Sequence, residues 1–532
     1  MRASSRFFPL HGAVILTLAA ASVGLAQQRG SASPHAPEPL LRSVQELLQR
    51  GDPGAARSEL AQALKQYPKE PVLHNFLGVL EAQQNRYKQA EESFRKAVML
   101  APAYAGAWEN LARLYHQNLD KDEQAGRKAI AAYEALLSLD PASAEANYQL
   151  AGLLLAQGEF ARARQHIDRL PAEAGARAQA LALRCAAEAG LGDMARAEAT
   201  AAQLVNSSDL TEADITSILP VLGRSNRERI AIRLLESLAS RRLASSDTLR
   251  SLASLYERQE QLPEARKTFE SAAAAGRVTA PLLLDLARVA YKQKDFEGAL
   301  SYLAHARDLE PNNAGIHFFW GLASVELELP VEAERALLKA VELNPENPYY
   351  NYALGAVVAG SKKWSDAIPY LKKYCEKKPD DPRGKLALAS AHYHTYEYDL
   401  ARKELREILD KPETAAGARY HLGLLAIQEN NFEEAVRELE EAVRLSPKYA
   451  AAHAELGFTY MQMEQFDKAR KALDRSLELQ PDDRRANMVL LSLYQRTEDP
   501  RAEAQMKKFE ELDKKLTEKT KLLLRTIEAR PY

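Results

Sequence analysis

The stretch AAAHAELGFTYMQMEQFDKARKALDRSLELQPDD, residues 450–483, is one copy of a unit that recurs along most of this 532-residue chain. Its Ala469 belongs to a series of thirteen alanines spaced 34 residues apart, with one insertion of five residues. The insertion lies between the second and third members of the series, which consists of Ala56, Ala90, Ala129, Ala163, Ala197, Ala231, Ala265, Ala299, Ala333, Ala367, Ala401, Ala435 and Ala469. A small side chain at so regular an interval predicts stacked helical hairpins, because two helices approach closely only where a side chain is small.

Proline marks the seam between successive repeats. The same 34-residue spacing relates Pro68 to Pro102, Pro311 to Pro345 and Pro379, and Pro447 to Pro481. Proline disfavours helix in the residue before it and fits easily at the start of the next helix. Between seams, apolar residues recur twice at helical spacing, which predicts two helices of about 12–14 residues joined by a short turn. The expected repeats start at Pro37, Pro71, Ala105, Ala144, Ala178, Glu212, Ser246, Ala280, Ala314, Pro348, Pro382, Ala416, Ala450 and Arg484.

These residues resemble the tetratricopeptide repeat (TPR) family, whose pattern is Leu and a small residue, an aromatic residue, Ala, an aromatic residue or Leu, Ala, and Pro. The repeat at 450 carries it as Leu456, Gly457, Tyr460, Ala469, Leu473 and Pro481. Other matches are Leu77, Gly78, Ala90, Phe94, Ala97 and Pro102; Trp108, Leu111, Ala112, Tyr115, Ala129 and Tyr133; and Leu252, Ala253, Tyr256, Ala265, Phe269 and Ala272. The resemblance implies an all-α fold, a right-handed superhelical solenoid of about fourteen antiparallel helix pairs.

The first 36 residues differ from the repeats. Arg2 and Arg6 precede an uncharged, mostly apolar run, Gly12 to Ala26, which ends in small residues. This pattern predicts a secretory signal peptide over 1–26, hence an exported, periplasmic or secreted protein without a membrane span after cleavage. The alternative is an uncleaved signal that anchors the chain in the inner membrane, although the run is shorter than the ~20 residues needed to cross a bilayer. Residues 27–36 are predicted to form a flexible linker.

The repeats divide into an N-terminal array, 37–177, and a C-terminal array, 246–517. Between them, residues 178–245 depart from the pattern. Arg184 and Cys185 replace the Leu–small pair, and Leu219 replaces a small residue and is followed by Pro220, which we expect to kink or break its helix. This segment is either a weakened joint or the product of sequence drift. The apolar stripe that leads into 518–532 predicts a helix that caps the array, with a dimerising coiled coil as the alternative.

The resemblance also predicts a binding surface, because first helices line the concave face in this family. Projecting the face positions onto the C-terminal array gives an apolar, aromatic stripe. Its members are Phe318, Leu322, Tyr349, Tyr352, Tyr393, Tyr420, Leu424, Phe458 and Met461. Aromatic anchors are frequent at binding hot spots, so we expect a groove for an extended or helical peptide. The alternative is that these rings only pack between adjacent first helices.

We found none of the common catalytic, nucleotide-binding or metal-binding motifs in the sequence. The sequence has no P-loop, GxGxxG, GxSxG or HExxH motif, so we expect no enzymatic activity and no cofactor. His392 and His394 lie two residues apart, which points them to different sides of a helix, so we expect no metal site. A net charge of −2 gives no field that favours nucleic acid. We expect a noncatalytic protein-binding scaffold of the cell envelope, or alternatively a polysaccharide-binding accessory subunit of a glycan synthesis or export machinery.

Overall fold

The computed structural model describes the backbone of residue 36 and residues 38–528, and side chains as far as residue 515. The predicted signal peptide, nearly all of the predicted linker, and residues 529–532 lie outside the described residues. Within the described part the chain is helical throughout, with 29 helices and no strand. The prediction of an all-α repeat fold is confirmed.

The chain forms two compact parts, which we call the N-terminal half, up to Arg277, and the C-terminal half, from Val278. The N-terminal half contains α1 (Glu38–Arg50), α2 (Pro53–Gln66), α3 (Pro71–Gln83), α4 (Tyr87–Leu100), α5 (Ala105–Gln117), α6 (Ala125–Leu139), α7 (Ala144–Gln157), α8 (Phe160–Asp168), α9 (Ala172–Gly175), α10 (Ala178–Leu191), α11 (Met194–Asn206), α12 (Glu212–Arg224), α13 (Glu228–Ser240), α14 (Ser246–Arg258) and α15 (Leu262–Ala275).

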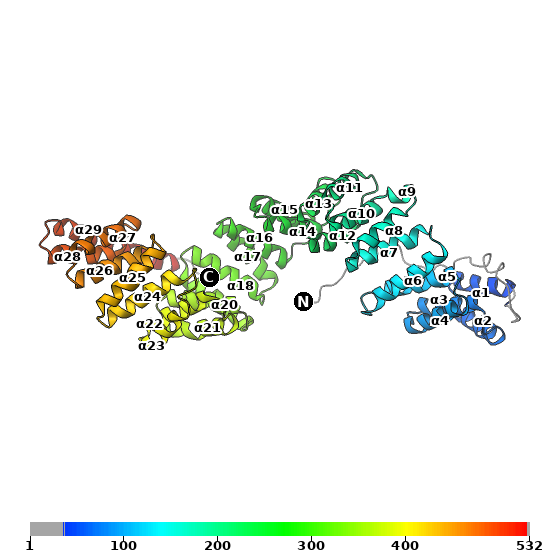
Figure 1. Cartoon of the computed structure of the whole chain (residues 1–532), viewed down its shortest axis with the longest axis horizontal. Coiled ribbons are helices and arrows are strands. Elements are labelled where there is room, and N and C mark those ends of the chain that lie inside the picture. Colours follow the sequence, from blue (N-terminus) through cyan, green and yellow to red (C-terminus); the bar gives the residue numbers. More distant parts are fainter. Residues whose placement is uncertain (1–35, 37, 529–532) are drawn as a thin grey trace. The chain divides into compact units, whose positions relative to one another are not determined.

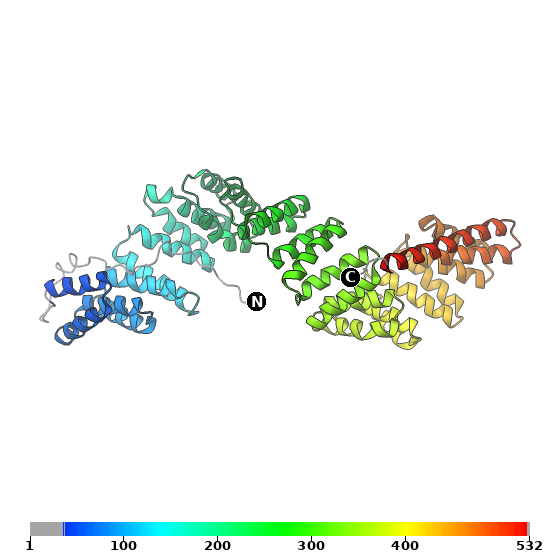
Figure 2. The same ribbon diagram turned by 180° about the vertical axis from the view of Figure 1, so that it is seen from behind.

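The C-terminal half contains α16 (Ala280–Lys292), α17 (Phe296–Leu309), α18 (Ala314–Glu326), α19 (Pro330–Leu343), α20 (Pro348–Gly360), α21 (Trp364–Lys377), α22 (Pro382–His394), α23 (Tyr398–Arg406), α24 (Ala415–Gln428), α25 (Phe432–Leu445), α26 (Ala450–Gln462), α27 (Phe466–Leu479), α28 (Arg484–Arg496) and α29 (Ala502–Glu528). Consecutive helices lie side by side as pairs (Figures 1 and 2). The first helix of every repeat begins within one residue of the expected start, and α9 is an extra short turn between repeats.

Small residues let the two helices of a repeat approach closely. All thirteen periodic alanines are buried, and Ala469 in α27 has no exposed surface. On the facing helix, a Cβ atom added at Gly457 would lie 2.6 Å from Cγ of Leu473, closer than atoms of this kind can pack. The same relation holds between Gly321 and Leu337, at 2.5 Å. The alanine and glycine positions therefore fix the spacing within each pair.

A polar side chain ties each proline seam to the helix that follows it. At seven seams, the residue at the fourth position of the repeat donates a hydrogen bond of 2.8–3.2 Å to the carbonyl oxygen of the proline six residues earlier. The donors are His74, Trp108, Asn147, His317, Asn351, His453 and Asn487. At an eighth proline seam, Lys385 occupies this position and pairs with Glu407 instead. The bond gives a partner to the carbonyl oxygen of the seam proline, which lies in the turn and accepts no hydrogen bond within a helix.

The five-residue insertion is accommodated in a turn. It lengthens the connection between α5 and α6, which runs from 118 to 124, whereas the connection between α3 and α4 needs only residues 84–86. On either side, α5 has 13 residues, as α3 does, and α6 has 15, one more than α4, with its periodic Ala129 buried. The insertion therefore changes a loop and leaves the stacking of the repeats intact.

The sequence led us to expect that Pro220 kinks or breaks its helix. A break is wrong, because α12 is continuous from Glu212 to Arg224, and a kink stays a prediction. A capping box between Thr211 and Asp214 closes its first turn, and buried residues such as Ile218 and Val221 on either side of the proline hold it against its neighbours. The hydrogen bond that proline removes is thus outweighed by burial. Whether residues 178–245 act as a joint stays a prediction.

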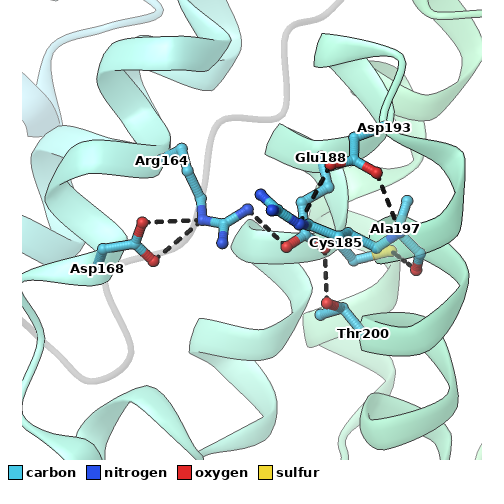
Figure 3. A network of polar contacts seen from close by, with 8 residues as sticks. Arg164, Asp168, Cys185, Glu188, Asp193, Ala197 and Thr200 are labelled. Carbon is cyan, nitrogen blue, oxygen red and sulfur yellow. Dashed lines mark hydrogen bonds and ion pairs between the residues drawn. The ribbon is translucent and has the colours of Figure 1, made fainter.

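The repeat at 178 contains a buried polar network in place of the family residues (Figure 3). Glu188 in α10 has a side chain only 3% exposed, and its carboxylate accepts hydrogen bonds from Arg164 of α8 at 2.6 Å and from Thr200 of α11 at 2.6 Å. Arg164 also pairs with Asp168. One turn away, Cys185 is buried with its sulfur 3.5 Å from the carbonyl oxygen of Ala197. The network links three helices of two repeats.

At the C-terminal end of the described part, α29 packs against α28. Gln505 donates a hydrogen bond of 3.0 Å to the side-chain oxygen of Asn487, and the Arg484 guanidinium lies 5.3 Å from the ring centre of Phe509. The side chains of Leu516, Leu523 and Ile527, which complete the predicted apolar stripe, lie outside the described residues. The choice between a capping helix and a dimerising coiled coil stays open as a prediction.

Candidate binding surface on the first helices of the C-terminal half

The nine residues predicted to bind a partner lie on α18, α20, α22, α24 and α26, the first helices of five successive repeats. Each of these helices contacts the next first helix along the chain. We call the surface that they and α28 carry the first-helix face. Tyr349 is 52% exposed and Met461 is buried, while the other seven residues are partly exposed. The prediction that these side chains form a binding site stays untested, but most of them offer surface to a partner.

The first group of these residues lies around α20. The ring of Phe318 lies 4.7 Å from that of Tyr350, and the ring of Tyr352 lies 4.8 Å from that of Tyr374 on α21. Tyr349 is also near Tyr374, with a centre-to-centre distance of 6.5 Å. The hydroxyl of Tyr374 bonds to Asp381 at the next seam, which fixes the ring that the other two tyrosines contact. Phe318, Tyr349, Tyr350 and Tyr352 therefore pack around this group and stay partly exposed, whereas Tyr374 is buried.

The second group lies on α22, α24, α26 and the start of α28, and we call it the Tyr420 cluster. The ring of Tyr420 lies 5.0 Å from that of Tyr449 and 5.2 Å from that of His421. Tyr393 lies 6.2 Å from the same histidine and accepts a hydrogen bond of 3.3 Å from Gln428. Half-buried rings with polar tips are suited to contact both apolar and polar parts of a peptide.

A fixed ion pair completes the Tyr420 cluster. Two nitrogens of Arg485 donate to the two carboxylate oxygens of Glu455, at 2.9 and 3.0 Å. The guanidinium lies 4.6 Å from the ring centre of Phe458. A planar guanidinium that is held by a carboxylate and lies over an aromatic ring is a rigid element of a recognition surface.

Burial sets the protonation states in this region. It raises the pKa of Tyr352, Tyr393 and Tyr420, so these hydroxyls stay neutral at physiological pH. It lowers the pKa of His421 to about 4, with a further contribution from His394. The first-helix face around these residues therefore presents neutral rings.

Sequence reasoning missed three residues of this surface, Tyr449, Glu455 and Arg485, and the buried Tyr374 on which its tyrosines pack. Tyr374 comes from a second helix, and Tyr449 is the last residue of its repeat, so a projection of first-helix positions excludes both. Arg485 occupies the second position of the last repeat. It would have been found had the projection been extended by one repeat.

The histidines that suggested a metal point to different surroundings. His392 is buried and contacts Glu404 at 3.0 Å and Glu397 at 3.5 Å, whereas His394 stacks on Trp364 with ring centres 3.9 Å apart. Among the described side chains, no group of three or more His, Cys, Asp or Glu residues is arranged to hold a metal ion. Nor is any described helix long and apolar enough to span a bilayer.

Sequence models of the tetratricopeptide repeat match residues 41–107, 120–187, 284–348, 320–382, 386–450 and 426–493, which together make up well over half of the chain. The chain belongs to the tetratricopeptide repeat family. Its TPR repeats are those of a protein-interaction scaffold, a fold that is typically noncatalytic. No curated protein matches the chain.

Solved TPR structures resemble the chain in part. A chain of the APC/C hetero-tetramer Cut9–Hcn1 is 13% identical with a TM-score of 0.40, over 86% of this chain and 96% of that one. Yeast Tom70 is 16% identical with a TM-score of 0.31, over 86% and 99%. YrrB, a TPR protein with an unusual peptide-binding site, is 22% identical with a TM-score of 0.25, over 41% and 95%. With TM-scores this low, none of these likenesses carries a functional argument.

Proposed function

We propose that this TPR protein is a noncatalytic adaptor of the cell envelope that holds a peptide or protein partner on the first-helix face of its C-terminal half. The observation that carries the proposal is the Tyr420 cluster. Partly exposed rings of Tyr393, Tyr420 and Phe458 lie beside a bidentate Arg485–Glu455 pair, all on consecutive first helices. Hot spots of protein interfaces are enriched in such Tyr and Arg residues.

The contacts within the cluster support recognition of a partner of defined shape. The rings of Tyr420 and Tyr449 are locked against each other, and Arg485 is held by Glu455, so little side-chain entropy remains to be lost on binding. The neutral hydroxyls of Tyr393 and Tyr420 favour a partner that brings apolar side chains and backbone hydrogen-bonding groups. An extended or helical peptide segment has these properties.

The location in the envelope rests on the start of the chain. Arg2, Arg6 and the apolar run from Gly12 to Ala26 form the pattern of a secretory signal. Fractionation of cells that express the full chain tests this part of the proposal. Recovery of a shortened protein outside the cytoplasm supports export with cleavage, and recovery of the full-length protein in the cytoplasm contradicts it.

Affinity of single variants for a captured partner tests the binding surface. We expect Tyr420→Ala and Tyr352→Ala to weaken binding about tenfold or more while the protein remains helical. Tyr396→Ala is the matched control, because Tyr396 is 80% exposed on the turn between α22 and α23, belongs to no first helix and has its ring against Tyr398. Equal affinity of all three variants and the unaltered protein would remove the proposed surface. A polysaccharide bound by the Tyr420 cluster in place of a peptide would also contradict the proposal.

A further inference from the structure

A second surface lies on the opposite side of the repeat at 314. The second helices α17 and α19 flank a cleft of about 600 Å³, and α18 forms its floor. Its lining consists of Arg307 from α17, His317 and Trp320 from α18, and Glu332, Arg335, Ala336, Leu338, Lys339 and Glu342 from α19. None of these residues is among the nine predicted to bind a partner or in the Tyr420 cluster.

Trp320 is the feature that distinguishes this repeat from the others in the C-terminal half. It occupies the seventh position of its repeat, where the other six repeats of that half have a buried leucine. Those leucines are Leu286, Leu354, Leu388, Leu422, Leu456 and Leu490, each no more than 6% exposed. Trp320 is only partly buried, because the larger indole reaches past the helix pair into the cleft. Leucine fills the equivalent core position in the other repeats. Packing within the helix pair therefore does not explain why this repeat has a tryptophan.

One cation, Arg307, lies over the indole. The guanidinium of Arg307 lies 4.8 Å from the ring centre of Trp320, and its ion pair with Asp308 is long, at 3.8 Å. Arg335 and Lys339 line the opposite wall. With Glu332 and Glu342 counted, the lining has three cations and two anions, and Lys339 and Glu342 already neutralise each other at 3.2 Å. A cation stacked on an aromatic ring, with few competing anions, is a docking point for a carboxylate.

The remaining lining is apolar. Leu338 is 40% exposed although it belongs to a helix with a well-packed opposite side, and Ala336 lies next to it in the cleft wall. No Asn or Gln side chain lines the cleft, and the Nε2 atom of His317 is already committed to the carbonyl oxygen of Pro311. The cleft therefore has no side-chain amide that could bind the hydroxyl groups of a sugar. An apolar side chain next to a carboxylate fits the surface better.

We propose that this cleft binds an acidic peptide segment in which an aromatic or aliphatic side chain is flanked by carboxylates. The apolar side chain packs against Trp320 and Leu338, and a carboxylate accepts hydrogen bonds from Arg307. The lining as a whole, with three cations against two anions, favours acidic over basic sequences. This inference goes beyond the proposed function, because the cleft would give the scaffold a second binding surface on the other side of the same half.

Calorimetric titration of the full chain with three probe peptides tests this inference. The probes are acetyl-Glu-Asp-Phe-Asp-Glu-amide and the two peptides in which its acidic residues are replaced by serine or by lysine. We expect the acidic peptide to bind most tightly, and Arg307→Gln and Trp320→Leu each to weaken it at least tenfold, or about 1.4 kcal/mol. Trp320→Leu restores the residue found in neighbouring repeats, so it should fold.

Two controls separate this inference from the proposed function. Arg437→Gln removes an exposed arginine on α25 and should leave the affinity for the acidic peptide unchanged. Tyr420→Ala should also leave it unchanged, because Tyr420 lies on the first-helix face. The inference is overturned if the acidic peptide does not bind, if the lysine or serine peptide binds as tightly, if glucuronate binds with greater affinity than the acidic peptide, or if Arg307→Gln has no effect.

Discussion

The side-chain nitrogen of Asn351 donates a hydrogen bond of 2.9 Å to the carbonyl oxygen of Pro345, and the same nitrogen donates to the carbonyl oxygen of Asn347 at 2.8 Å. Asn351 is 1% exposed, so these two protein acceptors take the place of water as partners of its amide. This arrangement joins the seam before the repeat at 348 to the first helix of that repeat. The same tie recurs at six other proline seams, and it explains why His, Asn or Trp stands at the fourth position of those repeats.

We expect Asn351→Ala to lower the free energy of unfolding by about 1–2 kcal/mol, because it removes the two hydrogen bonds of a buried amide. Lys385→Ala is the matched control. It changes the same position of the next repeat, where no tie to the seam proline exists, and the exposed pair with Glu407 contributes less than about 1 kcal/mol. Urea unfolding followed by circular dichroism measures both. Equal losses in the two variants would show that the tie is not stabilising.

Ala469→Leu tests the close approach of the paired helices. Ala469 has no exposed surface, and its carbonyl oxygen lies 3.1 Å from the place where a Cβ would stand on Gly457 of the facing helix. We expect overpacking to cost about 1–3 kcal/mol and to lower the melting temperature. Lys471→Leu, two residues along α27 at an exposed position, should change stability by less than about 0.5 kcal/mol. A stable Ala469→Leu variant would argue against small residues as the determinant of helix spacing.

The buried carboxylate of Glu188 gives a prediction in the N-terminal half. Glu188→Ala leaves Arg164 without its buried partner and Thr200 without its acceptor (Figure 3). We expect a loss of about 2–3 kcal/mol, less than for a fully buried pair because Arg164 is 23% exposed. Asp168→Ala removes the other partner of the same arginine, on the surface, and should cost less than about 1 kcal/mol. Comparable losses in both variants would mean that the burial of Glu188 does not increase the contribution of its contacts to the free energy of unfolding.

His421 predicts how stability depends on pH. Its pKa is lowered from 6.5 to about 4 by burial and by His394, so the unfolded chain binds a proton more readily than the folded chain. Its contribution to stability is therefore full above pH 6.5 and is lost as the pH falls to about 4, with a slope of up to about 1.4 kcal/mol per pH unit. We expect His421→Leu to unfold with a smaller loss of stability between pH 7 and pH 4 than the unaltered protein, as roughly one proton less is linked to unfolding. Identical pH profiles would contradict the lowered pKa.

Sequence patterns predicted most of the fold because the repeat constrains itself. Alanine recurs at one position in thirteen repeats because the paired helices approach closely at that position in every copy. The proline seams indicate where the following first helices begin. Pro220 was misjudged because the effect of one proline depends on how strongly its helix is buried, which local pattern does not reveal. The ties at the seams could have been predicted, since a polar or indole donor at the fourth position accompanies proline at seven of the eight proline seams.

The candidate surfaces were less predictable. Face positions identified Tyr420 and Phe458, but the rings and charges that hold them, Tyr449 and Arg485, come from a seam and from the next repeat. The cleft at Trp320 was not predicted. The sequence has tryptophan where neighbouring repeats have leucine, but only the structure shows that the indole lines a cleft between α17 and α19. Contacts between repeats depend on rotamers and on neighbouring side chains, and a position in a 34-residue pattern does not specify either.

Site-specific photo-cross-linking in intact cells tests the central claim most directly. A benzophenone amino acid is placed at Tyr420 on the first-helix face and, as a control, at the exposed Glu433 on the second helix α25. The account predicts a discrete protein adduct from position 420 that is absent from position 433. Adducts of the same partner from position 433 alone, or no protein adduct at 420 in cells where the partner co-purifies with the chain, would contradict it.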